Sequence, residues 1–171
     1  LSGAPLNSIH QNCSESYKFL DELKKACRVF DLKMIAGSFD PFSTLKNVPK
    51  TPKQRYEIMT EEMPKKGKNS LEMMYQTCGT QINLDYISER DFAKKFKLSC
   101  FLVPLSIGIF ANSPIKESKL NNYLSYRSYV WQNTSRGGLP KFFLEEMNFE
   151  KYVDMAIDMP LLFMRGFRLI D

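Results

Sequence analysis

Three polar side chains have the clearest capacity for chemistry. Arg127 carries a guanidinium that can hold a carboxylate through two parallel hydrogen bonds, which supplies both binding energy and orientation. Gln81 and Asn83 carry amides whose oxygens can ligate a hard cation and whose N–H groups can bind a carboxylate. These residue types point to a site for a small carboxylate-bearing substrate. The alternatives are a surface arginine at 127 and a structural amide pair at 81 and 83.

These side chains lie in two segments of alternating polarity, 77–85 and 125–131. A strand places successive side chains on opposite faces, so we predict two strands whose polar faces form the floor of a site. For the first segment, a half-exposed strand without a site is the simpler interpretation of the alternation alone. The second segment adds a guanidinium and aromatic rings, because one of its faces would carry Ser125, Arg127, Tyr129 and Trp131.

Helical and extended patterns alternate irregularly along the rest of the chain. This order favours an α+β fold with an antiparallel sheet over a parallel doubly wound sheet. We treat 1–171 as a single domain, since a chain of 171 residues can bury one sizeable core. The predicted helices cover 6–30, 52 to about 64–67, a short segment capped by Asn69 or Ser70, 88–110 and 148–158, whereas 33–39 and 161–168 are predicted to be strands and 42–52 and 115–122 loops.

Composition excludes several classes of protein. The net charge of +5 comes from lysines and arginines spread along the chain, and no nucleic-acid-binding motif occurs. The apolar stretch 98–111 is too short to cross a bilayer and contains Pro104, so we predict a buried, kinked helix and no membrane partner. Without a signal peptide and without metal-type cysteine spacing, we expect reduced thiols and a cytoplasmic location. The single histidine, His10, argues against nucleophilic catalysis by a Ser-His or Cys-His pair.

Several short motifs, in a consistent order, resemble those of glutamate–cysteine ligases of the plant and proteobacterial type. Any one of them is weak, but together they extend almost from end to end. They are Leu1-Ser2-Gly3-Ala4-Pro5-Leu6, Pro52-Lys53-Gln54-Arg55-Tyr56, Leu71-Glu72-Met73-Met74, Thr77-Cys78 through Asp85, Phe110-Ala111-Asn112-Ser113-Pro114, Ser125-Tyr126-Arg127-Ser128 with Trp131, and Phe149-Glu150-Lys151-Tyr152-Val153-Asp154.

The resemblance implies a fold and a reaction. The fold is the glutamine-synthetase-like catalytic fold, a curved antiparallel sheet backed by helices, here incomplete. The reaction joins the γ-carboxylate of L-glutamate to the amine of L-cysteine, with ATP and Mg²⁺ as cofactors and a γ-glutamyl phosphate as intermediate. It is the first step of glutathione biosynthesis. Such chemistry depends mainly on positioning and on neutralising charge.

The resemblance also implies roles for particular residues. Arg127 is the catalytic candidate, and Gln81 is in addition a candidate metal ligand. For Met74, Cys78 and Trp131 plain core packing is the alternative, and for Lys119 a solvated loop position. The remaining candidates are Gln81, Asn83, Ser125, Tyr129, Trp131, Met74, Cys78 and Arg55 for substrate binding, and Arg136 and Lys119 for ATP or phosphate.

The departures from the family pattern limit what the chain can do alone. The family's main metal-binding carboxylates lie ahead of the Leu-Ser-Gly motif, and no Gly-rich phosphate loop replaces them here. We therefore expect a piece of a longer protein that is inactive alone and self-associates through exposed edges. Two alternatives stay open: a non-catalytic amino-acid-binding or partner-binding protein on the same scaffold, and another carboxylate–amine ligase of the superfamily.

Overall fold

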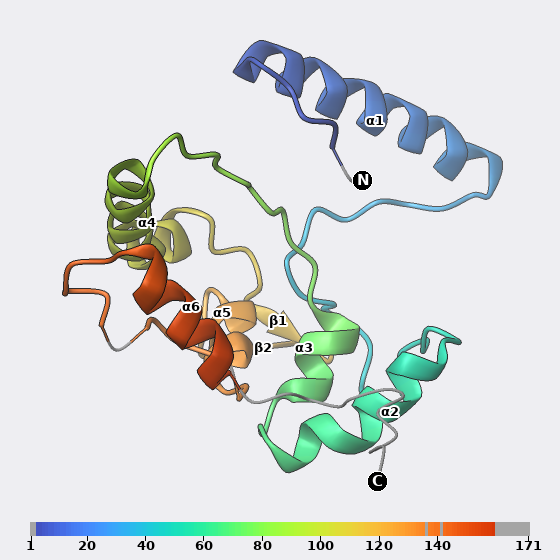
Figure 1. Cartoon of the computed structure of the whole chain (residues 1–171). Helices are drawn as coiled ribbons and strands as arrows, with labels where there is room; N and C mark the ends of the chain where they lie inside the picture. Colours follow the sequence, from blue (N-terminus) through green and yellow to red (C-terminus); the bar gives the residue numbers. More distant parts are fainter. Residues whose placement is uncertain (1–2, 136, 141, 160–171) are drawn as a thin grey trace, which may run out of the picture. The chain divides into compact units, whose positions relative to one another are not determined.

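The computed structural model describes residues 3–135, 137–140 and 142–159 (Figure 1). The chain forms two compact units, 1–36 and 37–171. The single catalytic domain over 1–171 stays a prediction. The strand pair predicted over 161–168 lies outside the described residues.

The first unit is built around one long helix, α1 (Ile9–Val29), as predicted. Ser8 caps its N-terminus, because the Ser8 hydroxyl oxygen accepts a hydrogen bond from the Gln11 backbone N–H at 3.3 Å. The helix ends at Phe30, and Asp31 then turns the chain with φ 51°.

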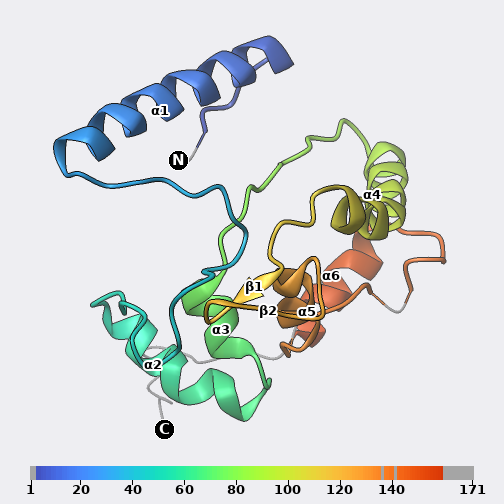
Figure 2. The same ribbon diagram turned by 180° about the vertical axis from the view of Figure 1, so that it is seen from behind.

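The second unit contains the remaining helices and a hairpin (Figures 1 and 2). The helices predicted near 52, 70, 88 and 148 are all present, with ends close to the predicted ones. Their bounds are α2 (Gln54–Glu62), the 3₁₀ helix η1 (Met63–Lys65), α3 (Ser70–Gln76), α4 (Glu89–Ile109), α5 (Tyr126–Gln132) and α6 (Phe149–Asp158), and the strands are β1 (Ile115–Lys116) and β2 (Lys119–Leu120).

Local caps explain where α4 and α6 begin. The Ser88 hydroxyl oxygen accepts from the Asp91 N–H at 3.2 Å, and the Asp91 carboxylate accepts from the Ile87 N–H at 3.1 Å. The Asn148 side-chain oxygen accepts from the Lys151 N–H at 2.8 Å. The bonds to Ser88 and Asn148 each satisfy a donor that the first helical turn leaves unpaired, and the bond from Ile87 fixes the chain just ahead of α4.

The predicted burial of 98–111 is wrong. Cys100 is the buried residue of α4, whereas the large apolar side chains of its second half are exposed. The predicted helix is correct because helix formation is local, whereas no other described element of the second unit covers the apolar side chains of its second half. We call these residues the α4 apolar face: Leu98, Phe101, Leu102, Val103, Leu105, Ile109 and Phe110. No helix in the described part of the chain is long and apolar enough to cross a membrane.

The hairpin β1–β2 corrects the prediction of a loop over 115–122. Ile115 pairs with Leu120 and Lys116 with Lys119 in antiparallel register. The two residues between the strands, Glu117 and Ser118, have φ values of 50° and 63°. A two-residue hairpin turn requires positive φ at both central positions. Here two residues other than glycine adopt that conformation.

Both strands predicted for the site are wrong. After α3, Thr77 forms a single antiparallel bridge with Phe39, and the chain to Ile87 has no regular structure. Residues 126–132 form the helix α5, in which Tyr126 and Val130, four positions apart, are the buried residues. That apolar spacing fits a helix as well as a strand in so short a segment, and burial decided for the helix. The strand predicted over 33–39 is also wrong, because a single bridge at Phe39 is the only strand pairing in that segment.

The core of the second unit joins these short segments. Phe39, Tyr126 and Val130 form a buried cluster, and Met73 and Tyr129 pack against it. The rings of Phe39 and Tyr126 meet edge to face with centroids 4.9 Å apart. Helices with one small antiparallel hairpin are compatible with the predicted α+β class. A large curved sheet does not occur among the described residues.

Candidate substrate-binding site

The first turn of α5 places Arg127. Ser113, which is buried, lies in a parallel bridge with Ser125 just before the helix. The Ser113 carbonyl accepts from the Tyr126 N–H at 3.2 Å, and its hydroxyl oxygen accepts from the Arg127 N–H at 3.1 Å. A helix of seven residues is too short to be stable alone, so these bonds define where α5 begins and thereby position Arg127.

The guanidinium of Arg127 lies close to an indole ring and to a glycine. Its central carbon stands 5.5 Å from the centre of the Trp131 ring, a distance at which cation and ring attract each other. A Cβ added at Gly79 would lie 2.7 Å from Arg127 Nη2. Gly79 therefore makes room for the guanidinium through the absence of a side chain.

Arg127 also has unused hydrogen-bonding capacity. Its Nε is buried and has no hydrogen-bond partner. Within the described ranges, no acidic side chain forms an ion pair with it. A buried guanidinium nitrogen without an acceptor is costly, and a bound carboxylate would supply one.

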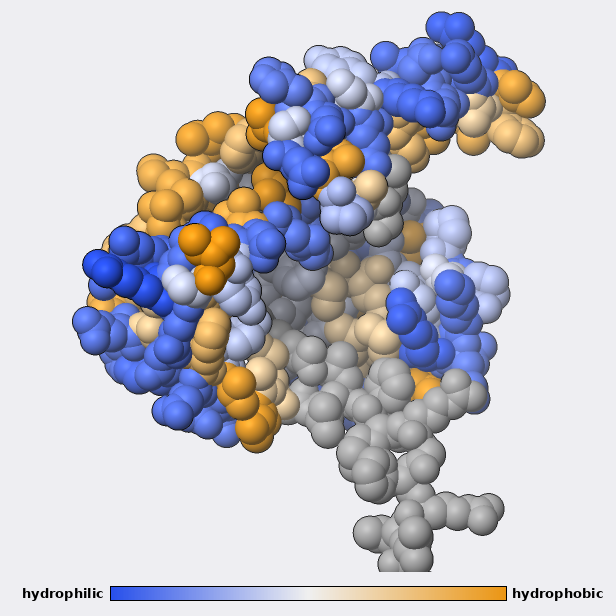
Figure 3. All heavy atoms as spheres, turned by 45° about the horizontal axis from the view of Figure 1, so that its top comes forward, coloured by the Kyte–Doolittle hydropathy of each residue, from blue (hydrophilic) through white to orange (hydrophobic). Residues whose placement is uncertain are grey.

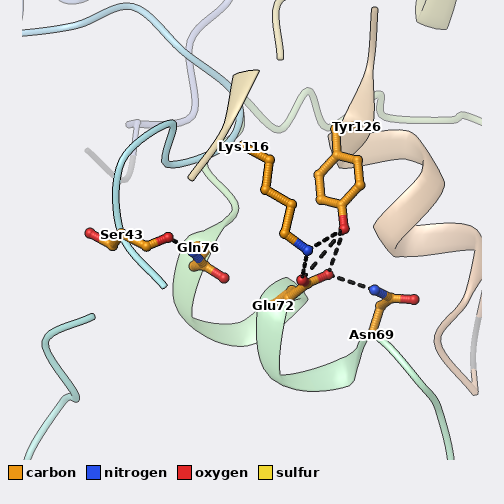
Figure 4. Close-up of polar contacts among 6 residues, drawn as sticks. All are labelled: Ser43, Asn69, Glu72, Gln76, Lys116 and Tyr126. Carbon is orange, nitrogen blue, oxygen red and sulfur yellow. Dashed lines mark hydrogen bonds and ion pairs between the residues drawn. The ribbon is translucent and has the colours of Figure 1, made fainter. Parts of the chain in front are cut away.

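The chain around Gly79 is held in place by the segment 38–43. The Cys78 N–H donates to the Ser38 carbonyl at 3.0 Å, and the Asp40 N–H donates to the Gln76 carbonyl at 2.8 Å. The Gln76 side chain, almost fully buried, donates to the Ser43 carbonyl at 2.6 Å (Figure 4). Gly79 thus follows directly on a segment that pairs with another part of the chain.

Asp40 stabilises the turn that carries Ser43. One of its carboxylate oxygens accepts from the backbone N–H groups of Phe42 at 2.9 Å and Ser43 at 3.0 Å. Partial burial opposes ionisation, but the hydrogen bonds from Ser43 and Phe42 outweigh it and lower the pKa of Asp40. The carboxylate is therefore ionised in the folded protein at neutral pH.

A largely buried polar network joins α3, β1 and α5 (Figure 4). Lys116 Nζ donates to Glu72 Oε1 at 2.5 Å and to the Tyr126 hydroxyl at 2.7 Å. The Tyr126 hydroxyl donates to Glu72 Oε2 at 3.1 Å, and Asn69 Nδ2 donates to the same oxygen at 2.5 Å. Glu72 and Tyr126 are each only 7% exposed.

Two pKa values in this network are raised. Burial disfavours the charged form of Lys116, but its hydrogen bonds to Glu72 and Tyr126 outweigh burial and raise the pKa of the ammonium. Burial raises the pKa of the Tyr126 phenol, which stays protonated and can donate. The sequence analysis missed Glu72, Lys116 and Tyr126 as a group. Glu72 lies 44 residues from Lys116 and 54 from Tyr126, so no local spacing indicated them.

Several predicted site residues do lie near Arg127 along the chain. The hydroxyls of Ser125 and Ser128 are hydrogen-bonded at 2.8 Å. Tyr129 stacks on Tyr123 with centroids 4.5 Å apart, which makes its ring part of an aromatic cluster. Trp131 is 39% exposed, so it covers the guanidinium at the surface and does not pack in the core.

The structure leaves other predicted residues without a demonstrated place in this group. The Cys78 thiol is exposed, and Met74 is half-buried in α3. The Arg55 guanidinium lies over the Tyr56 ring at 5.1 Å and is exposed. Lys119 is exposed on β2, and Arg136 lies outside the described residues.

Gln81 and Asn83 do not form a metal site in this structure. The Gln81 amide donates to the Asn83 side-chain oxygen at 2.9 Å, and both residues are exposed. In the described part of the chain, no three His, Cys, Asp or Glu side chains gather to hold an ion. These residues do not fit Mg²⁺, which needs several oxygen ligands at close range.

A pocket of about 320 Å³ lies beside α4, away from the residues that place Arg127. It is lined by Asn83, Tyr86, Phe92 and Phe96, among others, and Arg127 is not part of it. Lys95 in its wall donates to the Asp85 carbonyl at 2.6 Å and to the Asp91 carboxylate at 2.8 Å. We place the candidate site at Arg127, because its buried Nε has no acceptor among the described residues.

Comparisons with known proteins agree over almost the whole chain. The sequence model of the glutamate-cysteine ligase family 2 matches residues 1–168. Glutamate–cysteine ligase A, chloroplastic, of Oryza sativa subsp. japonica is 43% identical over 175 residues, which is 100% of this chain and 36% of the relative. The chloroplastic glutamate–cysteine ligases of Nicotiana tabacum and Arabidopsis thaliana are 43% and 41% identical over 166 residues, 95% of this chain and 32% of each relative. The chain spans about a third of the length of these curated relatives.

Proposed function

Because the chain belongs to the glutamate-cysteine ligase family 2, we propose that it supplies the amino-acid side of the active site of a glutamate–cysteine ligase. The complete enzyme would use ATP to convert the γ-carboxylate of L-glutamate into a γ-glutamyl phosphate. The amine of L-cysteine would then attack the acyl carbon and release phosphate, which gives γ-glutamylcysteine for glutathione biosynthesis. The relatives' names support the substrates of this proposal.

The observation that carries the proposal is the state of Arg127. Its guanidinium is held by Trp131 and Gly79, its Nε is buried without an acceptor, and no acidic side chain of the described residues neutralises it. In this proposal Arg127 binds a carboxylate of L-glutamate and thereby orients the substrate. Trp131 limits the motion of the guanidinium and shields it partly from water.

The proposal assigns binding of Mg²⁺ and ATP to polypeptide beyond these 171 residues. The described residues do not gather the ligands that the metal needs. The α4 apolar face supports the same division, because residues 98–110 contain no charged side chain and yet most of their large apolar side chains lie exposed. Figure 3, in which hydrophobic residues are orange, shows such side chains gathered at the surface. A helix that is apolar on all sides normally lies in the interior of a larger protein.

We therefore assign the α4 apolar face to contact with the remainder of a ligase of the length of its relatives, which have about two thirds of their residues outside the match. It follows that residues 1–171 alone form no γ-glutamylcysteine. The glutamine-synthetase-like sheet would then be completed by the same additional polypeptide. We also propose a cytoplasmic location, which differs from the chloroplastic location in the relatives' names. Cell fractionation tests it.

Calorimetric titration of L-glutamate into the chain tests the proposal. Binding should be lost in Arg127→Ala and weakened in Arg127→Lys, because an ammonium cannot replace the two-pronged contact. Arg28→Ala, which removes the same charge at an exposed position of α1, is the matched control. Succinate and L-alanine show which part of glutamate is recognised. Equal binding of L-glutamate by wild type and Arg127→Ala would refute the proposed role. If the protein is instead a non-catalytic amino-acid-binding protein, the chain should bind L-glutamate but the full-length protein should form no γ-glutamylcysteine.

A further inference from the structure

The network of Glu72, Lys116 and Tyr126 has features that packing alone does not explain. An ion pair with one partner only 7% exposed loses much of its hydration, and this loss offsets most of the attraction between the charges. Apolar side chains of similar size would pack α3 against α5 at a smaller cost. What charged groups provide in addition is a defined direction, since each hydrogen bond accepts only a narrow range of geometry.

Tyr126 is the member of the network that bears on the candidate site. It is the residue before Arg127 and the first residue of α5. Its hydroxyl accepts from Lys116 and donates to Glu72, and the Lys116 ammonium also lies 4.9 Å from the centre of its ring. The rotation of α5 about its own axis is therefore fixed at the residue adjoining the arginine.

Three parts of the chain meet at this hydroxyl. Glu72 comes from α3, Lys116 from β1 and Tyr126 from α5 (Figure 4). The same α3 leads through Gln76 and Thr77 to Gly79, against which the guanidinium lies. The network thus links the two walls of the Arg127 site, the helix that carries the guanidinium and the segment that accommodates it.

We propose that Glu72, Lys116 and Tyr126 are positioning residues that hold Arg127 at the distance from Gly79 and Trp131 that carboxylate binding requires. This inference rests on the proposed function for its consequence in glutamate binding. Its geometric content, the orientation of Arg127, can be measured without any ligand. None of the three residues needs to touch the substrate.

The chain provides its own reporter. Trp131 is the only tryptophan, is partly exposed and lies 5.5 Å from the Arg127 guanidinium. Its fluorescence therefore responds to the position of that cation. Arg127→Met defines the emission of an indole without its cation. Tyr126→Phe removes one hydroxyl and keeps the ring in the core.

We expect the emission of Tyr126→Phe to shift from that of the wild type toward that of Arg127→Met. Its circular dichroism should stay native, and its affinity for L-glutamate should fall about tenfold, the loss of one charge-assisted hydrogen bond. Tyr17→Phe, the same chemical change at an exposed position of α1, is the matched control and should equal the wild type in both measurements.

Two results would overturn the inference: wild-type emission and affinity in Tyr126→Phe, or the same changes in Tyr17→Phe. If the wild type binds no glutamate, the proposed function fails, while the emission still decides whether Tyr126 positions Arg127. Should Tyr126→Phe fail to fold, the double variant E72Q/K116M removes both charges together and keeps the tyrosine. The inference then requires that this variant shift the emission toward that of Arg127→Met, and unchanged emission refutes it.

Discussion

Gly79→Ala is the most direct perturbation of the Arg127 site. The new Cβ would lie 2.7 Å from Arg127 Nη2, 3.3 Å from Cζ and 3.4 Å from Nε. Ordinary van der Waals contact begins at 3.4 Å, so the nearest nitrogen must retreat by about 0.7 Å. Since the obstructed atoms are the far end of a flexible side chain, the guanidinium should move and the backbone should stay.

The expected magnitude follows from hydrogen-bond geometry. Charge-assisted N–H···O bonds are about 2.7–2.9 Å long, and a displacement of about 0.7 Å lengthens them to the limit of bonding. Loss of a bond to a charged group costs about 1.5–3 kcal/mol, which weakens the affinity for L-glutamate roughly 10- to 150-fold. Gly79 does not have positive φ, so stability should change by less than about 1 kcal/mol.

The assay combines calorimetric titration of L-glutamate, Trp131 emission and urea unfolding followed by circular dichroism. Gly108→Ala is the matched control, because a Cβ added at Gly108 meets no atom within 4 Å apart from the adjoining backbone of its own helix. Alanine is also the better residue inside α4, so this control should keep its affinity and be equally or more stable. The reasoning is refuted if Gly79→Ala retains wild-type affinity and emission, or if Gly108→Ala loses affinity to the same extent.

Three further predictions concern stability, association and thiol reactivity. The folded pKa of Asp40 lies below its unfolded value of 3.8, so its contribution is present above that pH and is lost as pH falls through the folded pKa. Asp40→Asn should therefore be less stable than wild type by up to about 1 kcal/mol at pH 7, with the difference vanishing in acid; a constant difference contradicts this. Self-association of the isolated chain through the α4 apolar face should decrease in Leu105→Gln, and a wild type that is monomeric by light scattering at high concentration contradicts it. In the folded protein, Cys78 should react with a disulfide reagent at once and Cys100 only on unfolding, because burial both hides Cys100 and raises its pKa; equal rates would refute this.

The elements that could be predicted from the sequence are those whose signals are local. Ser8, Ser88 and Asn148 each cap a helix through a bond to a residue three positions later, so the sequence around each cap contains both partners. The family was likewise predicted from short motifs in a consistent order, and the comparison over residues 1–168 confirmed it.

The site itself was only partly predictable. Arg127 and Trp131 were chosen from residue type and motif, and the structure does bring them together. The reason given was wrong, because it relied on a strand in which positions 127 and 131 share a face. They also share a face in the helix α5, where residues four apart are neighbours. The choice therefore survived a wrong assignment of secondary structure.

Periodicity, caps and motifs in the sequence by itself determined the long helices and the family, and they led to Arg127 as the site candidate. Only the tertiary structure decided that 126–132 is a helix and that Gly79 faces the guanidinium. It also paired Tyr126 with Glu72 across 54 residues. The physical reason is that local hydrogen bonds depend on neighbours along the chain. The conformation of a short segment depends instead on which distant side chains bury it.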